Sequence, residues 1–251
     1  MRKITKKIVA IGGGEITEHE TLSIDKRIIE LTGKLHPKIL FIPTAKSDEE
    51  AYCQDFFNYF EKELGCKVSF LKLCINTPTH AEIKDIIMGA DAIYVGGGNT
   101  LKMIRLWRRL GVDRILKKAW EAGIVLSGIS AGAICWFEGG HSDSMSFYNS
   151  SKWNYINVHG LGFLKGILCP HYNSGTFGIP RKEWFSIMMR KTSNTGIAID
   201  EGCAIEFIDD SYRVINSSPQ SSAYKVFKKN GQLISEEIQK SKRYTSYAKL
   251  I

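Results

Sequence analysis

Short apolar runs that end near glycines alternate with segments of helical spacing up to Phe137, and this alternation constrains the fold more than any other feature. A strand followed by a helix, repeated, requires right-handed crossovers and a mostly parallel sheet. The apolar runs are nearly continuous, as is typical of a sheet that helices cover on both faces. The sequence therefore predicts a doubly wound, mostly parallel α/β fold. The expected strands are Lys6–Gly12, Lys38–Pro43, Lys67–Leu73, Asp91–Val95 and Gly123–Gly128.

Helices are expected between these strands, where apolar residues recur every three or four positions. One of them is capped by Ser47 or Asp48 and ends at Gly65. Ligands of a doubly wound sheet bind beyond the carboxyl ends of the strands, so the residues that follow each strand are the first candidates for a site. The other expected helices are Asp25–Thr32, Thr79–Met88, Thr100–Leu110, Asp113–Glu121 and Ala131–Phe137.

The pattern loosens after Gly139. Gly140–His159 is polar, aromatic and rich in Ser and Asn, which predicts a long loop. The sequence contains no internal repeat and no low-complexity linker, so a single domain is expected. Residues 1–222 would form its α/β body, and residues 223–251 a C-terminal β-hairpin and basic tail of the same domain. The hairpin turn is predicted at Asn230-Gly231, after a strand at Gly162–Cys169, a helix at Arg181–Lys191 and further short strands.

Composition narrows the class of protein. Hydrophobic residues make up 43% of the 251 positions, enough to bury a large core and to exclude disorder as the main state. No apolar run approaches the roughly 20 residues that a membrane-spanning helix needs. Met1–Lys7 is basic, but the apolar stretch that follows is shorter than a secretory signal requires. A cytoplasmic location is expected.

Charge and cysteine content argue against two classes of partner. The net charge is +8, yet Lys and Arg are scattered and lack the interleaved aromatic residues of an RNA-binding surface. A solvated basic surface is therefore expected, with no nucleic-acid partner. The six cysteines include no C-x-x-C pair, so free buried thiols are expected instead of a disulfide framework or a zinc site.

The segment Gly128-Ile129-Ser130-Ala131-Gly132 carries the clearest chemical signal. It follows a predicted strand and precedes a predicted helix, which is the context of a nucleophile elbow. The sharp turn would expose the Ser130 hydroxyl, and the N–H of Ala131 would be a natural donor to an oxyanion. The alternative is an ordinary Gly/Ser turn that closes a strand.

A nucleophilic serine needs a base and an acid. His171 is the preferred base because Leu168-Cys169-Pro170-His171 ends a strand, where the elbow also opens; His141 and His159 are alternatives. Asp143 is one candidate acid, and it lies between nucleophile and base in the sequence. Spacing alone does not choose among Asp143 and its competitors, which are Glu138, Asp200 and Glu201.

Two further glycine clusters follow predicted strands. Gly96-Gly97-Gly98 precedes Asn99-Thr100 at a helix start, where backbone N–H groups could serve as a second set of oxyanion donors. Gly12-Gly13-Gly14 invites comparison with dinucleotide-binding loops, but it lacks the G-x-G-x-x-G spacing of those loops. A nucleotide site is therefore not expected.

Taken together, the motifs resemble the peptidase E (S51) family of serine peptidases, in the class I glutamine-amidotransferase-like superfamily. The likeness is greater to uncharacterised S51-like bacterial proteins than to the aspartyl dipeptidase of the family. It implies a flavodoxin-like doubly wound fold and a serine-type peptidase that hydrolyses small peptides without metal or cofactor. The matching segments are Ile11–Gly14, Phe41–Ala45, Val95–Thr100, Gly128–Ala133, Pro170–Tyr172 and Asp200–Gly202.

The resemblance also implies residue roles. Ser130 would be the nucleophile, His171 the general base and Asp143 the acid, with the N–H groups of Gly97, Gly98 and Ala131 around the oxyanion. Asn99 and Arg181 would contact substrate, Arg181 at the place of an arginine that holds an N-terminal aspartate in the dipeptidase. A small peptide is the expected substrate and a homodimer the expected assembly, with no membrane partner.

Two other interpretations of the same scaffold are weighed against a peptidase. The amidotransferases of the superfamily carry cysteine at the elbow, whereas this chain has Ser130 there and Cys135 five residues later. Glutamine hydrolysis by a cysteine is therefore not expected. The retained alternative is a non-catalytic protein that binds a small acidic metabolite through Arg181 and the glycine-rich strand ends, since one fold can serve many functions.

Overall fold

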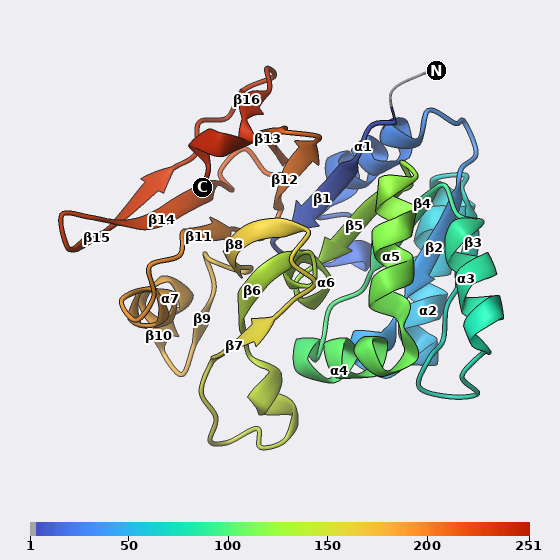
Figure 1. Ribbon diagram of the computed structural model, residues 1–251, viewed down its shortest axis with the longest axis horizontal. Coiled ribbons are helices and arrows are strands. Elements are labelled where there is room, and N and C mark those ends of the chain that lie inside the picture. The colour runs from blue at the N-terminus through green and yellow to red at the C-terminus, as the bar shows by residue number, and fades with distance from the viewer. Residues whose placement is uncertain (1–3) are drawn as a thin grey trace.

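The computed structural model describes residues 4–251, and within them the larger sheet has eight strands (Figure 1). Five adjacent strands, up to one edge of the sheet, run parallel to one another, and the other three are added by antiparallel pairing at the opposite edge. In spatial order the strands are β16 (Thr245–Ser246), β13 (Ser211–Asn216), β12 (Cys203–Ile208), β1 (Lys7–Ile11), β5 (Val125–Ile129), β4 (Ala92–Val95), β2 (Lys38–Ile42) and β3 (Lys67–Phe70). All five strands predicted before Phe137 are present, and the mostly parallel α/β class is confirmed.

Helices cover both faces of this sheet, as the apolar strands require. Ile8 and Ala10 of β1 belong to one apolar core, while Val9 and Ile11 point to the other. The first core is closed by α3 (His80–Met88), α4 (Thr100–Leu110), α5 (Val112–Glu121) and α6 (Ala131–Ile134). The second is closed by α1 (Leu22–Thr32) and α2 (Glu50–Phe57), which continues as a π-helical segment, η3 (Asn58–Glu63).

A second sheet, of six strands, packs beside the first (Figure 1). In spatial order it contains β15 (Gln232–Glu237), β14 (Ala223–Lys229), β11 (Gly196–Ile199), β8 (Leu164–Cys169), β6 (Phe137–Ser142) and β7 (Ile156–His159). β6, β8 and β11 are parallel neighbours. The chain passes between the two sheets at Ser130 and again at Asp200–Gly202, so the carboxyl ends of β5, β8 and β11 converge where the sheets meet.

The prediction of a long loop at Gly140–His159 is wrong at both ends of the segment. β6 extends to Ser142 and β7 covers Ile156–His159, with a 3-10 turn, η4 (Ser144–Phe147), between them. The helix predicted at Ala131–Phe137 is shorter than expected: it ends at Ile134, and β6 begins at Phe137. His141 and Ser142 are fully buried in spite of their polarity. A buried strand built from glycine and polar residues lacks the apolar signal by which strands are recognised.

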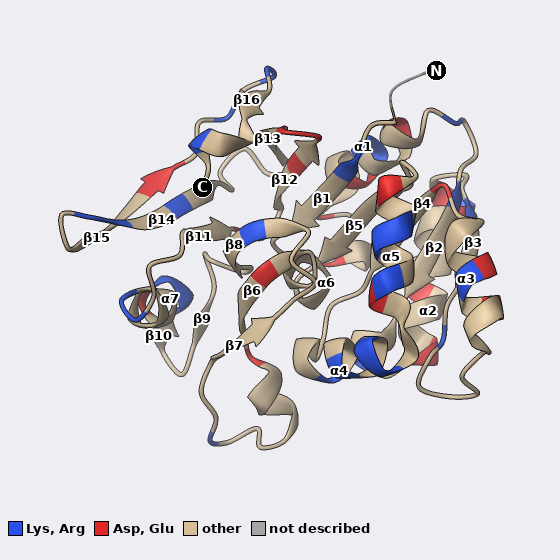
Figure 2. Ribbon diagram, viewed as in Figure 1, with Lys and Arg blue, Asp and Glu red and all other residues tan. Residues whose placement is uncertain are grey.

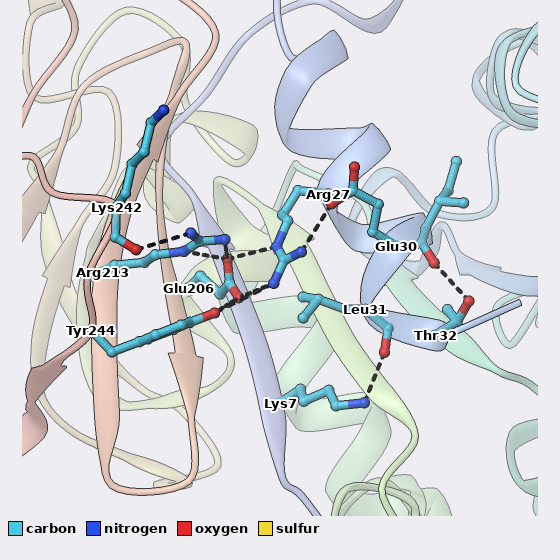
Figure 3. Close-up of polar contacts among 10 residues, drawn as sticks. Lys7, Arg27, Glu30, Leu31, Thr32, Glu206, Arg213, Lys242 and Tyr244 are labelled. Atoms are coloured by element: carbon cyan, nitrogen blue, oxygen red, sulfur yellow. Dashed lines mark hydrogen bonds and ion pairs between the residues drawn. The ribbon is translucent and has the colours of Figure 1, made fainter.

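The C-terminal segment is tied to the body by a buried carboxylate (Figure 3). Glu206 of β12 is fully buried and accepts hydrogen bonds from Arg27 of α1 at 3.0 Å, from Arg213 of β13 at 2.9 Å, and from the Tyr244 hydroxyl. Burial opposes the Glu206 charge, but these donors outweigh it, and the pKa of the carboxyl is lowered. Residues 223–237 form the β14–β15 hairpin, and β14 pairs with β11.

Charged residues are distributed over many elements of the surface. Lys and Arg lie on α4, α5, α7 (Arg181–Met189), β8 and β14 (Figure 2). All six cysteines are free, and Cys74 alone among them is partly exposed. Within residues 4–251, no helix is long and apolar enough to cross a membrane.

The buried carboxyl of Asp25 predicts a pH-dependent stability. Its Oδ2 accepts hydrogen bonds from Thr21 at 2.7 Å and Tyr59 at 3.1 Å, yet burial raises its pKa to about 7. The unfolded carboxyl loses its proton near pH 4, whereas the folded one keeps it to about pH 7. The contribution of the Asp25 carboxyl to the free energy of unfolding is therefore complete below pH 4. It is lost as the pH rises to 7, and the total loss is about 4 kcal/mol.

The measurement is the free energy of unfolding of wild type and Asp25→Asn between pH 4 and pH 8. The asparagine side chain keeps an acceptor for the two hydroxyl groups but does not titrate. Relative to wild type, the variant is expected to gain stability steadily up to about pH 7 and no further. A difference that stays constant from pH 4 to pH 7 would contradict the prediction.

Candidate active site

Three strand ends bring a serine, a histidine and a glutamate into one hydrogen-bonded chain. Ser130 follows β5, His171 follows β8, and Glu201 follows β11. The Nε2 atom of His171 lies 2.8 Å from the Ser130 Oγ, and its Nδ1 atom lies 2.7 Å from Oε1 of Glu201. This is the geometry of a nucleophile, a base and an orienting acid.

Ser130 has the backbone conformation of a nucleophile elbow. Its φ is 55° and its ψ is −112°, a left-handed conformation that residues with side chains rarely adopt. Both flanking glycines are required by close approach. A Cβ on Gly128 would lie 2.2 Å from the Gly132 carbonyl oxygen, and one on Gly132 would lie 2.1 Å from that of Val95. The turn therefore tolerates neither side chain, as the crowded-elbow interpretation predicts.

Three successive carbonyl groups at the end of β1 hold the three segments in place. Ile11 accepts the N–H of Ser130 at 3.1 Å, Gly12 that of His171 at 3.0 Å, and Gly13 that of Gly202 at 2.9 Å. The glycine cluster after the first strand thus has a structural explanation, because the backbone there contacts all three neighbouring strand ends. Gly13 also faces the side-chain pair directly: a Cβ there would lie 2.4 Å from Nδ1 of His171.

Glu201, and not Asp143, lies against His171, and this corrects the choice of acid. Asp143 follows β6, where its carbonyl accepts the Ser146 N–H inside a 3-10 turn. β6 is separated from β11 by β8, which bears His171. Glu201 follows β11, the parallel neighbour of β8 on the other side. Its N–H donates to Oδ1 of Asn173 at 2.9 Å, which fixes the turn.

The other two competitors are engaged elsewhere. Asp200 is buried, and its Oδ2 accepts the Ser222 N–H at 2.9 Å. Glu138 accepts the Gly166 N–H at 2.9 Å. The structure therefore selects one carboxylate from the four that the sequence left open.

Electrostatics fix the tautomer of His171. The hydrogen bond with His171 lowers the pKa of Glu201, so this carboxylate is ionised and can only accept. Nδ1 of His171 must then carry the proton that it donates to Glu201. In the neutral imidazole, Nε2 then has its lone pair toward Ser130 and can accept the hydroxyl proton.

The alternative histidines lie away from Ser130. His141 is fully buried, stacks on Tyr155 and has its Nδ1 3.6 Å from Cys169 Sγ. Burial, and next the nearby charge of Arg181, lower the pKa of His141 to about 2. His159 is exposed at the end of β7. Neither can take the Ser130 proton.

The expected oxyanion donors divide into two groups. Gly97 does not offer a free N–H, because it donates to the Tyr52 hydroxyl at 3.1 Å, and this corrects its assignment. For Gly98, no acceptor of its N–H lies within residues 4–251. Ala131 is the first residue of α6, so its N–H has no acceptor within the helix. Gly98 lines the same pocket as Ser130.

Tyr52 was missed by sequence reasoning. Its spacing with Phe56, four positions later on α2, indicates ordinary core packing. Its ring does pack on Phe41, but its hydroxyl reaches the Ser130 pocket and accepts the Gly97 N–H. Burial raises its pKa to about 12, so the hydroxyl keeps its proton and can donate it to a further acceptor.

Asn99 and Arg181 do not line the Ser130 pocket, and both substrate-contact assignments are corrected. The Asn99 side chain caps α4 through the Lys102 N–H at 2.9 Å and donates to the Ser144 carbonyl at 3.4 Å. Arg181 is 4% exposed, donates to the His141 carbonyl at 2.9 Å and lies over the Tyr155 ring. Its burial also removes the basis for an acidic-metabolite binding protein.

The pocket that contains Ser130, His171 and Glu201 has a volume of about 470 Å³. This is within the range of small-molecule sites. Segments that follow β1, β2, β4, β5, β8 and β11 line it, as expected at the carboxyl ends of strands. Among its other lining residues are Glu15, Glu20, Lys46, Tyr52 and Asp55.

Comparisons with known proteins agree with this architecture. The model of peptidase family S51 matches residues 8–215. The uncharacterized peptidase YgaJ of Bacillus subtilis (strain 168) is 39% identical over 223 residues, covering 88% of this chain and 92% of that protein. The uncharacterized peptidase Lmo0363 of Listeria monocytogenes is 32% identical over 146 residues, 55% of this chain and 67% of that one.

Two solved structures share the fold. The crystal structure of a peptidase from an acI-B1 Actinobacterium superposes with a TM-score of 0.72 at 20% identity, covering 97% of this chain and 98% of that chain. A putative peptidase E protein from Listeria monocytogenes EGD-e gives a TM-score of 0.64 at 23% identity, covering 85% and 100%. Identities this low support the fold alone.

Fold and sequence together define the class as a serine-type peptidase. The chain belongs to peptidase family S51. The resemblance inferred from the ordered motifs is thereby confirmed.

Proposed function

We propose that this chain hydrolyses short peptides through a Ser130–His171–Glu201 triad and an acyl-enzyme intermediate. The observation that carries the proposal is the continuous hydrogen-bond chain from Ser130 Oγ through both ring nitrogens of His171 to Glu201. A strained serine, a hydrogen-bonded histidine and an ionised carboxylate lie together in one pocket. They are the requirements of nucleophilic acyl transfer.

In the first half of the reaction, Ser130 Oγ attacks the peptide carbonyl carbon while its proton moves to Nε2 of His171. The carbonyl π electrons move to oxygen, and the N–H groups of Gly98 and Ala131 are the proposed donors to this oxyanion. Collapse breaks the C–N bond, and the protonated His171 gives its proton to the leaving amine. Glu201 stabilises the charged imidazole throughout.

In the second half, water replaces the amine. His171 removes a proton from the water, whose oxygen attacks the Ser130 ester. Collapse of the second tetrahedral intermediate releases the acid and returns the proton to Ser130 Oγ. The cycle consumes one water and leaves the enzyme unchanged.

The test is covalent labelling of the purified protein by a fluorophosphonate, with the modified peptide identified by mass spectrometry. A nucleophile activated by its neighbours should be labelled at Ser130 and at no other serine. Ser127, buried on the same strand three positions earlier, is an internal control. Absence of labelling at Ser130 in folded protein would refute the proposal.

Gly13→Ala is expected to lower kcat by roughly 100-fold although it substitutes neither Ser130 nor Glu201. The added Cβ would lie 2.4 Å from His171 Nδ1 and 2.8 Å from Glu201 Cγ, so the pair must move apart. Displacement of a catalytic group by about 1 Å can lower the rate by about 100-fold. Gly33→Ala is the control, because an added Cβ there has no atom within 4 Å; its φ of 70° will cost some stability, but kcat should be unchanged. Equal kcat in the two variants would contradict the prediction.

Three expectations from the sequence stay predictions. They are the boundary between body and C-terminal tail at residue 222, a cytoplasmic location and a homodimer. Light scattering on the purified full chain measures the assembly directly. A monomer at micromolar concentration would refute the homodimer.

A further inference from the structure

The pocket around Ser130 is acidic in a chain whose net charge is +8. Within residues 4–251, the carboxylates of Glu15, Glu20 and Asp55 line it besides the Glu201–His171 pair, against a single ammonium from Lys46. The excess of negative charge is therefore local and opposes the charge of the protein as a whole. A local field of this kind raises the concentration of cationic ligands at the site.

The three carboxylates are not neutralised by the protein. Within residues 4–251, none of them forms an ion pair. Glu20 accepts the backbone N–H of Glu15 at 2.8 Å, which orders the loop after β1. The one ammonium is held over the Tyr52 ring, 4.3 Å from its centroid, and not against a carboxylate. Glu15 and Asp55 are exposed side chains with free hydrogen-bonding capacity toward a ligand.

Glu15 is close to the reacting groups. It lies two residues after Gly13, where an added Cβ would lie 2.4 Å from His171 Nδ1 and 2.8 Å from Glu201 Cγ. After burial, which is the main cause, the Glu15 charge contributes to the raised pKa of Tyr52. The Tyr52 hydroxyl in turn accepts the N–H of Gly97, beside the proposed oxyanion donor Gly98. A substrate group that contacts Glu15 would therefore lie beside the scissile bond.

We infer that this pocket selects short peptides whose N-terminal residue is cationic, with a protonated α-amine and a Lys or Arg side chain, bound by Glu15 and Asp55. The inference rests on the proposed function and names its substrate class. For a peptide that begins with aspartate, Lys46 is the one lining cation among residues 4–251, and it lies over the Tyr52 ring, while Arg181 is buried outside the pocket. Against this single ammonium, the aspartate side chain would face three carboxylates.

The experiment compares three dipeptides that share a leaving residue: Lys-Leu, Leu-Leu and Asp-Leu. For the wild-type full chain at low salt, kcat/KM is expected to fall in that order, with Lys-Leu at least about tenfold above Asp-Leu. At 1 M salt the ratio should shrink to within about threefold, because the Debye length falls to roughly 3 Å. A preference for Asp-Leu, or measurable hydrolysis of Lys-Leu and Asp-Leu at equal rates at low salt, would overturn the inference.

Charge-neutral variants identify the residues responsible. The double variant Glu15→Gln/Asp55→Asn should lose the Lys-Leu preference, so that its kcat/KM for Lys-Leu falls to the value it has for Leu-Leu. Glu18→Gln is the matched control, since Glu18 is exposed on the same loop but does not line the pocket, and it should keep the preference. An unchanged preference in the double variant would also overturn the inference.

Binding separates this inference from the proposed function. Calorimetry on Ser130→Ala measures the affinity for each dipeptide without turnover. Stronger binding of Lys-Leu than of Asp-Leu supports the substrate class even if the wild type hydrolyses neither, which would refute only the proposed function. Equal binding refutes the substrate class even if wild-type turnover is normal.

Discussion

Ser130→Ala is expected to lower kcat for dipeptide hydrolysis by roughly 10⁶-fold, with little change in KM. Loss of the nucleophile of a triad abolishes nearly the whole contribution of the triad, and the residual rate comes from the oxyanion donors and from binding. The fold should survive, because Ser130 is held by its backbone: its N–H donates to Ile11 and its carbonyl accepts the N–H groups of Ala133 and Ile134. The melting temperature and the kcat of the purified variant are the measurements.

Cys135→Ala provides the matched control for this prediction. Cys135 is the nearest thiol in the sequence to the elbow, is fully buried, and burial raises its pKa well above the ordinary value. A buried neutral thiol is not a nucleophile. Its removal should leave kcat within about twofold of wild type, apart from a modest loss of stability. A Ser130→Ala variant with kcat within tenfold of wild type would contradict the mechanism.

The parts of the site that the sequence predicted are local in the chain. The elbow around Ser130 needs five residues between a strand and a helix, and His171 directly follows a strand that ends in Cys169-Pro170. Parallel strands place their carboxyl ends together, so each residue could be assigned to the site without knowledge of the strand order. The geometry agrees, with 2.8 Å between Ser130 Oγ and His171 Nε2.

The carboxylate that contacts His171 could not be predicted even from the strand order. Asp143 follows β6 and Glu201 follows β11, and both strands are parallel neighbours of β8, the strand that His171 follows. Local turn geometry distinguishes the two: the Asn173 side chain accepts the Glu201 N–H, and Glu201 reaches the imidazole. This contact leaves no periodic signal in the sequence.

Hydrogen bonds between segments far apart in the sequence explain the errors at Gly97 and Arg181. Gly97 was assigned as a donor from its glycine cluster, but Tyr52, 45 positions earlier, occupies its N–H. Arg181 was assigned to substrate from its position after His171, but the strand hidden in Gly140–Ser142 supplies the His141 carbonyl that it binds. In both cases the partner lies in a segment whose pattern indicated a different role.

Glu201→Gln is expected to lower kcat by roughly 10³-fold while Asp143→Asn leaves it unchanged. A glutamine amide can turn its NH₂ group toward Nδ1 of His171, which would place the imidazole proton on Nε2 and remove the lone pair that Ser130 needs. Substitution of a buried triad acid lowers kcat by about 10⁴-fold, which is an upper bound for Glu201→Gln. The Glu201 side chain is 46% exposed, so water can partly replace it.

The pair of variants separates the two candidate acids because each removes one charge and preserves the shape of its side chain. The rate of Ser130 labelling by a fluorophosphonate should fall with kcat in Glu201→Gln, since both reactions need the Ser130 proton to move to His171. Melting temperatures close to wild type would exclude a general loss of structure. If Asp143→Asn slowed labelling and Glu201→Gln did not, the acid would have to reach His171 by a rearrangement of the β6 end, and the hydrogen bond between His171 and Glu201 would not be the catalytic one.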